Sequence, residues 1–230
     1  MKLRMTADGS SGGFTVSGRI YQWAAKRATA GLTFLPSHKR YNLTISDEKQ
    51  FVWFRVAKVG TRSIFRAFEA AGVPLSVDNA IFAHYPVASY AGYFKFAFVR
   101  NPWERFVSAW HDKIIDRNHF GLSPERHAEL KAFPRFVEFA GSLDLKRCDV
   151  HLRLQSELID LNTIDFLGRM ETFGGDLQTV FKKLSIPAPS VPKENSSSRS
   201  GDYRSHYTDE LAARVAELYR KDIAIFNYVF

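Results

Sequence analysis

The chain has 230 residues, of which 45% are hydrophobic and 14% aromatic, so it is long enough to bury one substantial core and has the usual size of one domain. The formal charge of +8 and the pI near 9.6 suit an anionic partner, whether a nucleotide, a glycan, a nucleic acid or an acidic membrane. Charge alone does not choose among these classes.

Cysteine usage and hydropathy exclude two further classes. Cys148 is the only cysteine, which excludes an intrachain disulfide and favours a reducing compartment. Residues 1–50 contain no apolar run near the ~20 residues that span a bilayer, and residues 1–18 lack the pattern of a signal peptide. The sequence therefore predicts a cytoplasmic protein.

The first 40 residues differ in composition from the rest. Residues 6–18 are rich in Gly, Ser and Thr, which is typical of disorder, and residues 19–30 have the composition of a short basic helix. We expect residues 1–40 to be an N-terminal extension and residues 41–230 to form one domain. The basic segment suits contact with that domain or peripheral contact with a membrane, and the sequence leaves both open.

The first strand–helix unit follows. Residues 51–56 have strand composition, and residues 57–61 break it. Apolar residues then recur at helical spacing from Ile64 to Ala71, and the helix is predicted to end at Gly72.

Residues 78–92 are predicted as a loop, which leads to a second strand–helix unit. Residues 93–99 are aromatic and β-branched, as in a strand. Asn101 is then the expected N-cap and Pro102 the first helical residue.

The remaining elements complete an α/β pattern. Further helices are predicted at 124–140, 148–161, 173–184 and, capped by Thr208, 209–226, with a short strand at 165–168. Strands that alternate with helices predict a central parallel sheet flanked by helices, with ligands bound at the carboxyl ends of the strands.

The loop after the first strand has a phosphate-binding pattern. Its residues are Lys58, Val59, Gly60, Thr61, Arg62 and Ser63. At a strand–loop–helix junction, backbone N–H groups and the positive helix end hold phosphate, as in P-loop proteins. This is not a Walker A loop, because the lysine precedes the glycine and no acidic strand end offers a magnesium ligand.

A second motif begins where the second strand ends. Arg100 stands at the strand end and Ser108 in the following helix, so together they are candidates for a second phosphate. Simpler interpretations exist for both motifs. Lys58 could be a solvent-facing loop residue, and Arg100 could be an ion-pair partner of Glu104.

The ordered pair of motifs resembles the 5′-phosphosulfate loop and the 3′-phosphate motif of the carbohydrate sulfotransferase superfamily, which includes the Golgi glycan O-sulfotransferases and bacterial relatives. The resemblance extends over roughly residues 51–230. It implies 3′-phosphoadenosine 5′-phosphosulfate (PAPS) as donor and 3′-phosphoadenosine 5′-phosphate (PAP) as product. Because a sulfuryl group carries less negative charge than a γ-phosphoryl group, amides and one or two cations suffice, and no metal is expected.

The resemblance also implies roles for individual residues. Lys58 would contact the bridging oxygen of the leaving phosphate, and Arg100 and Ser108 would bind the 3′-phosphate. Residues 195–199 match a loop that closes over the donor. The residues implied around the donor are Lys58, Val59, Gly60, Thr61, Arg62, Ser63, Arg100, Ser108, Asn195, Ser197 and Arg199.

His84 precedes the second strand and resembles the catalytic histidine of glycan 2-O-sulfotransferases. An imidazole with a pKa of ~6.5 is suited to accept the proton of an attacking hydroxyl. Glu104 and Asp112 are alternative carboxylate bases. Histidines near the same region are His111, His119 and His127.

The predicted function is therefore PAPS-dependent O-sulfotransfer to a carbohydrate or glycoconjugate. Scattered basic residues would suit an acceptor that is already anionic. The alternative is a basic nucleic-acid or polyanion-binding module without catalysis, which leaves both phosphate motifs unexplained, so no nucleic acid is expected as partner. A nucleotide kinase with a degenerate loop would require magnesium and prefer ATP. The sequence predicts no oligomeric state.

Overall fold

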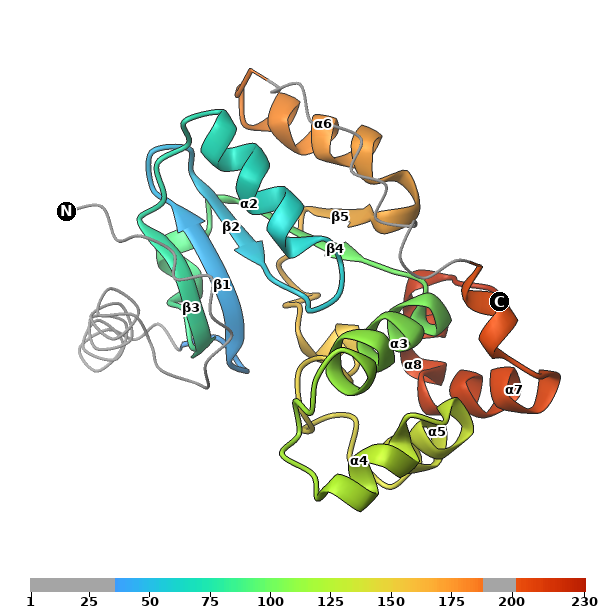
Figure 1. The fold of residues 1–230 in the computed structure, drawn as a ribbon. Coiled ribbons are helices and arrows are strands. Elements are labelled where there is room, and N and C mark those ends of the chain that lie inside the picture. The colour runs from blue at the N-terminus through green and yellow to red at the C-terminus, as the bar shows by residue number, and fades with distance from the viewer. Residues whose placement is uncertain (1–35, 188–201) are drawn as a thin grey trace.

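A five-stranded sheet lies at the centre of the computed structural model, which describes residues 36–187 and 202–230 (Figure 1). The strand order is β3-β1-β2-β4-β5. The strands are β1 (Tyr41–Ser46), β2 (Phe51–Phe54), β3 (Val77–Ala83), β4 (Phe94–Val99) and β5 (Phe166–Arg169).

Most of the sheet runs in one direction. β2 is parallel to β4, and β4 is parallel to β5, whereas β1 is antiparallel to both of its neighbours, β2 and β3. Of the five described strands, β1 is therefore the one that runs opposite to the others. The predicted α/β class with a central sheet flanked by helices is confirmed, and the sheet predicted as parallel is parallel except for β1.

Helices form two groups around the sheet. Figure 1 shows α2 and α6 side by side over one face, where Phe68 of α2 stacks on Phe181 of α6 at 5.4 Å. The second group lies beyond the carboxyl end of β4 and contains α3, α4, α5, α7 and α8 (Figure 1). The helices are α2 (Thr61–Ala70), α3 (Pro102–Trp110), α4 (Pro124–Leu130), α5 (Phe133–Gly141), α6 (Phe173–Lys183), α7 (Asp209–Leu218) and α8 (Arg220–Phe226).

Short helical turns connect these elements. They are 3₁₀ helices at Val87–Tyr90, Gln155–Glu157, Met170–Thr172 and Tyr203–His206, and a π-helix at His111–Ile115 directly after α3. None of the described helices is long and apolar enough to cross a membrane.

Aromatic side chains fill the core between the sheet and α2. Trp53 stacks on Phe96 of the adjacent strand at 6.1 Å, and Phe51 stacks on Phe68 of α2 at 5.0 Å. All four rings are buried, and each contributes roughly 2–3 kcal/mol through removal of apolar surface from water. This packing holds the C-terminal half of α2 against the first residue of β2.

Both predicted strand–helix units are confirmed. β2 leads through a loop into α2, and β4 leads directly into α3. The Asn101 side chain accepts a hydrogen bond from Trp103 N at 3.0 Å, and Pro102 is the first residue of α3. The short strand near residues 165–168 is β5, and the predicted helix at 173–184 is α6.

The prediction of a loop at 78–92 was wrong in its first half, because β3 occupies Val77–Ala83. The polar residues Asp78 and Asn79 interrupt its apolar pattern, and its register against β1 is irregular. Pairing with β1, which lies more than 30 residues away, decides the structure of this segment.

The helix predicted at 148–161 is also wrong, since the segment consists of turns and the 3₁₀ helix Gln155–Glu157. Carboxylates bind the backbone N–H groups that a helix would use. Asp149 accepts from His151 N at 2.9 Å, and Asp222 accepts from Gln155 N at 2.6 Å. Side-chain acceptors of this kind compete with helix formation.

Two predicted long helices are each divided. The 124–140 stretch forms α4 and α5, because Pro134, which suits the first turn of a helix and not its interior, lies in the first turn of α5. The helix capped by Thr208 ends at Leu218, and the chain turns at Tyr219, whose hydroxyl donates to Leu152 O at 2.7 Å. The basic helix predicted at 19–30 lies outside the described residues.

Candidate functional site

The loop between β2 and α2 has the backbone form of an anion site. Lys58 and Gly60 both have positive φ values, 70° and 73°. Gly60 is the N-cap of α2. Because it has no side chain, no capping side chain accepts from the first N–H groups of α2. These N–H groups and the positive end of a ten-residue helix suit a phosphate group.

The other loop residues differ in exposure. Val59 is buried, Ser63 is half-buried and Arg62 is exposed. The Thr61 hydroxyl donates to Val56 O at 3.1 Å, which closes the loop on itself. The structure therefore gathers the predicted residues into one turn, with Val59 as its apolar anchor.

The Lys58 ammonium lies 3.0 Å from the Asp112 carboxylate. Burial lowers the pKa of Lys58, and the charge and hydrogen bond of Asp112 oppose that shift. Asp112 also pairs with Lys113 at 3.2 Å and with Arg117. Burial would raise the pKa of Asp112, but these cations hold it well below its ordinary range, which makes Asp112 a poor proton acceptor.

Arg100 joins the second motif to the first. Its guanidinium Nη1 donates to Lys58 O at 3.4 Å, and Nη2 pairs with Glu104 at 2.7 Å, so the ion pair considered as the simpler interpretation is present. Arg100 is only 7% exposed, and among the described residues its Nε is buried without a hydrogen-bond partner. A buried donor of this kind is expected to have an acceptor in a ligand complex.

The side chain of Gln155 positions the backbone of Arg100. Its Oε1 accepts from Arg100 N at 3.0 Å, and its Nε2 donates to Arg100 O at 2.9 Å. Sequence analysis missed this residue, because it lies 55 positions along the chain in a segment predicted as helix. Ser108 is half-buried in α3 and makes no hydrogen bond with Arg100.

His84 follows β3 at the same edge of the sheet as the loop. Its Nδ1 lies 2.8 Å from Ser37 O, so Nδ1 carries the donated proton and Nε2 of the neutral ring is an acceptor. In the strand order, β1 stands between β3 and β2, which puts the two strands roughly 10 Å apart at ~4.8 Å per step. Three further residues that were predicted to contact PAPS lie outside the described residues. They are Asn195, Ser197 and Arg199.

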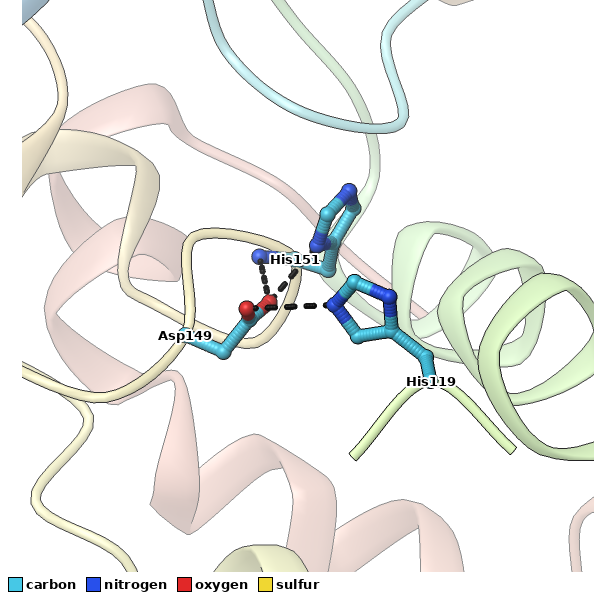
Figure 2. Close-up of side chains that lie close together, drawn as sticks. All are labelled: His119, Asp149 and His151. Carbon is cyan, nitrogen blue, oxygen red and sulfur yellow. Dashed lines mark hydrogen bonds and ion pairs between the residues drawn. The ribbon is translucent and has the colours of Figure 1, made fainter. Parts of the chain in front are cut away.

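A cluster of two histidines and one aspartate lies beside the loop, and sequence analysis did not connect its members. His119, Asp149 and His151 come from two separate segments, and their side chains converge (Figure 2). No short-range spacing signals this group, because 30 residues separate His119 from Asp149.

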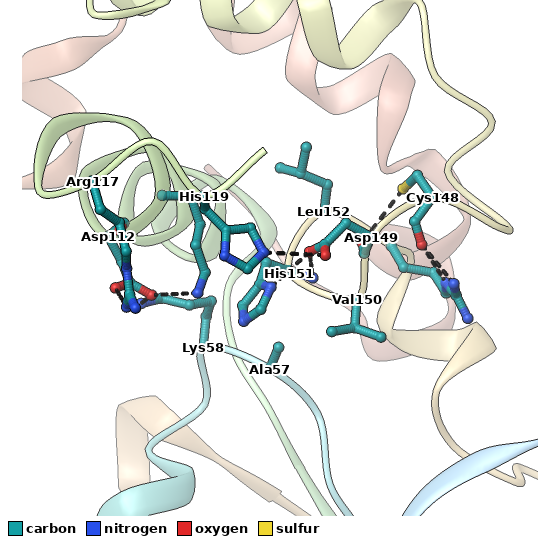
Figure 3. Close-up of polar contacts among 12 residues, drawn as sticks. Ala57, Lys58, Asp112, Arg117, His119, Cys148, Asp149, Val150, His151 and Leu152 are labelled. Atoms are coloured by element: carbon teal, nitrogen blue, oxygen red, sulfur yellow. Dashed lines mark hydrogen bonds and ion pairs between the residues drawn. The ribbon is translucent and has the colours of Figure 1, made fainter. Parts of the chain in front are cut away.

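The role of Arg105 was also not predicted from the sequence. It is 1% exposed, and its guanidinium donates to Ala57 O and to Val150 O, each at 3.0 Å. It thereby connects the residue before Lys58 to the residue before His151. Figure 3 shows the Lys58–Asp112 pair and the His119–Asp149–His151 cluster as neighbours in one view.

Comparison with protein families assigns the chain. A sequence model described as "Sulfotransferase family" matches residues 80–229, which is well over half of the chain. The match includes His84, β4 and the Arg100 motif, and it begins after the Lys58 loop. No curated protein and no solved structure matched the chain. The chain belongs to the sulfotransferase family.

Proposed function

We propose that this chain transfers the sulfuryl group of PAPS to a hydroxyl of a carbohydrate or glycoconjugate. Family membership gives the general class of reaction, sulfuryl transfer. The donor, the acceptor class and the proton acceptor are proposed from the geometry of the two motifs and from their resemblance to the glycan sulfotransferases.

The contact between Arg100 and the Lys58 loop carries the proposal. These residues are 42 positions apart in sequence, and the 3.4 Å contact brings two cations together at the carboxyl ends of β2 and β4. An unsatisfied buried donor such as Arg100 Nε costs about 1–3 kcal/mol. Phosphate and carboxylate oxygens both match the geometry of a guanidinium, so Arg100 together with the N–H groups at the start of α2 fits a ligand with two phosphate groups.

Each of the proposed site residues has its own role in the transfer. N–H groups at the start of α2 hold the 5′-phosphate, and Arg100 with Ser108 holds the 3′-phosphate. PAPS, when bound, supplies the sulfuryl group. His84 Nε2 takes the proton from the acceptor hydroxyl as its oxygen bonds to sulfur. Lys58 stabilises the negative charge on the phosphate oxygen whose bond to sulfur breaks.

Calorimetric titration with PAP, in buffer without metal, tests the donor site. We expect PAP to bind more tightly than ATP, and Arg100→Ala to weaken PAP binding by about 2–4 kcal/mol, because it removes a charge-assisted contact in a buried site. Arg220→Ala is the control, since that side chain is 79% exposed. Equal binding by the Arg100→Ala and Arg220→Ala variants, with unchanged circular dichroism, would refute the donor site.

Turnover tests His84. PAP release is measured with PAPS and a panel of desulfated glycans. We expect His84→Ala to lower kcat by about 10²- to 10⁴-fold while PAP affinity stays unchanged, as for loss of a general base. His38→Ala is the control, because His38 is an exposed histidine. Full turnover by His84→Ala would assign proton transfer to another residue.

A further inference from the structure

The geometry points to a binding site for one divalent transition-metal ion, with Zn²⁺ as the reference ion, formed by His119 Nε2, Asp149 and His151 Nδ1. These ligand atoms all lie within 4.8 Å of one another. Figure 2 shows both imidazole rings directed at the Asp149 carboxylate. This site lies outside the sulfuryl-transfer chemistry, for which no metal is expected.

The distances suit a small adjustment to metal coordination. His119 Nε2 lies 3.3 Å from Asp149 Oδ2, and His151 Nδ1 lies 2.6 Å from Asp149 Oδ1. In tetrahedral zinc sites with bonds of about 2.0–2.1 Å, neighbouring ligand atoms are roughly 3.3 Å apart. The first pair already has that spacing, and the second would widen when the ion replaces the proton on Nδ1.

The chain holds these side chains on well-anchored backbone. His119 N donates to Lys113 O at 3.0 Å, at the end of the π-helix His111–Ile115, and π-helical turns are frequent at functional sites. The turn with Asp149 and His151 is anchored by two buried side chains. Arg105 donates to Val150 O, and the Tyr219 hydroxyl donates to Leu152 O. Preorganised ligands of this kind favour binding.

The chemistry of the ligand set selects the class of ion. Two imidazoles and one carboxylate suit Zn²⁺, Co²⁺ or Ni²⁺ rather than Ca²⁺ or Mg²⁺, which prefer oxygen ligands alone.

A hydrogen-bonded cluster without metal is the competing explanation. Asp149 accepts from the His151 ring and from His151 N, so one histidine already satisfies Oδ1. In that explanation His119 Nε2 would donate to Asp149 Oδ2 across 3.3 Å, which is long for a hydrogen bond to a carboxylate and matches the ligand spacing of a metal site. Among residues 36–187 and 202–230, this is the one group of three His, Cys, Asp or Glu side chains that converges in this way.

Metal binding would join two segments that border the transfer site. His119 follows the π-helix that carries Asp112, the partner of Lys58. His151 follows Val150, which Arg105 connects to Ala57. The ion would thus be structural, and its effect on sulfuryl transfer would be indirect.

Titration of the full, untagged chain with ZnCl₂ tests the site by calorimetry at pH 7, with Co²⁺ absorption as a second probe. We expect one ion per chain. His119→Ala should weaken binding at least about 100-fold, because even loss of a residue outside the first coordination shell costs 10- to 100-fold. His38→Ala and Cys148→Ser should bind like wild type, since neither residue is a ligand in the proposed site.

Thermal unfolding gives an independent readout. Zn²⁺ should raise the midpoint of wild type and of Cys148→Ser, but not that of His119→Ala. Asp149→Asn, which keeps an oxygen to accept from His151 N, should also lose the zinc-dependent shift. The absence of zinc binding to wild type, or equal binding by His119→Ala, would show a hydrogen-bonded cluster alone and overturn the proposal.

Discussion

The Asp112 carboxylate balances the charge of the cations around Lys58. It pairs with Lys58, Lys113 and Arg117, and Lys113 is itself buried. Removing the carboxylate would leave cations without a partner in a half-buried site, which costs more than the loss of a surface pair. Asp112 thus supports the donor site through charge and position rather than as a base.

We predict that Asp112→Asn lowers the free energy of unfolding by about 1–3 kcal/mol at pH 7. Because the folded pKa of Asp112 is depressed, its stabilisation is complete above the unfolded value of ~3.9 and disappears as the pH falls through the folded value. The difference between wild type and variant should therefore be constant from pH 7 to 5 and shrink below about pH 4.

Urea unfolding at pH 7, 5 and 3.5 measures this difference. Asp116→Asn is the matched control, because Asp116 is an exposed carboxylate four positions away that makes no ion pair among the described residues. It should change stability by less than about 0.5 kcal/mol. A difference for Asp112→Asn that stays the same at pH 3.5 would contradict the linkage.

At the scale of elements, the turn between β2 and α2 depends on Gly60. Its φ of 73° is in the left-handed region, and an added Cβ would lie 3.0 Å from the Met170 Sδ and Cε atoms. The methionine end is flexible and can move, so backbone strain is the larger cost. That strain acts at the first turn of α2, where the phosphate is proposed to bind.

We predict that Gly60→Ala lowers stability by about 1–2 kcal/mol and weakens PAP binding, since the N–H groups of the loop change direction. Gly174→Ala is the matched control, because Gly174 lies in α6, has no positive φ and would have no atom within 4 Å of its Cβ. It should raise stability by about 0.4–1 kcal/mol. Denaturant unfolding and PAP calorimetry of both variants measure these effects.

Local sequence signals predicted the elements that local contacts determine. The Asn101-Pro102 pair marked the start of α3 because cap and first turn are neighbours in sequence. β3 escaped prediction because β1 supplies its partners, and the helix predicted at 148–161 fails because Asp222, more than 60 residues later, binds its N–H groups.

The same division holds for the candidate site. Lys58 and Gly60 share one strand–helix junction, so their pattern was visible in the sequence. Only the folded chain brings three other groups close to that junction, and no spacing in the sequence predicts such contacts. These groups are Asp112, Gln155 and the proposed metal ligands. Arg105 lies between Arg100 and Ser108 in the sequence, yet its two carbonyl partners belong to other segments.

At the scale of the whole molecule, the C-terminal helix α8 positions the end of β4 through one buried carboxylate. Asp222 is 0% exposed and accepts from Gln155 N at 2.6 Å and Ser156 N at 3.0 Å. Gln155 in turn holds both backbone groups of Arg100. Three segments far apart in sequence therefore determine where the Arg100 guanidinium lies.

We predict that Asp222→Ala lowers the free energy of unfolding by about 2–5 kcal/mol, because it leaves two buried N–H groups without an acceptor, and that it also weakens PAP binding. Asp222→Asn retains one acceptor oxygen and should cost less. Asp209→Ala, at an exposed carboxylate in the first turn of α7, should cost under about 1 kcal/mol and leave PAP binding unchanged. If Asp222→Ala remains folded and binds PAP like wild type, the connection from α8 through Gln155 to Arg100 does not determine the donor site.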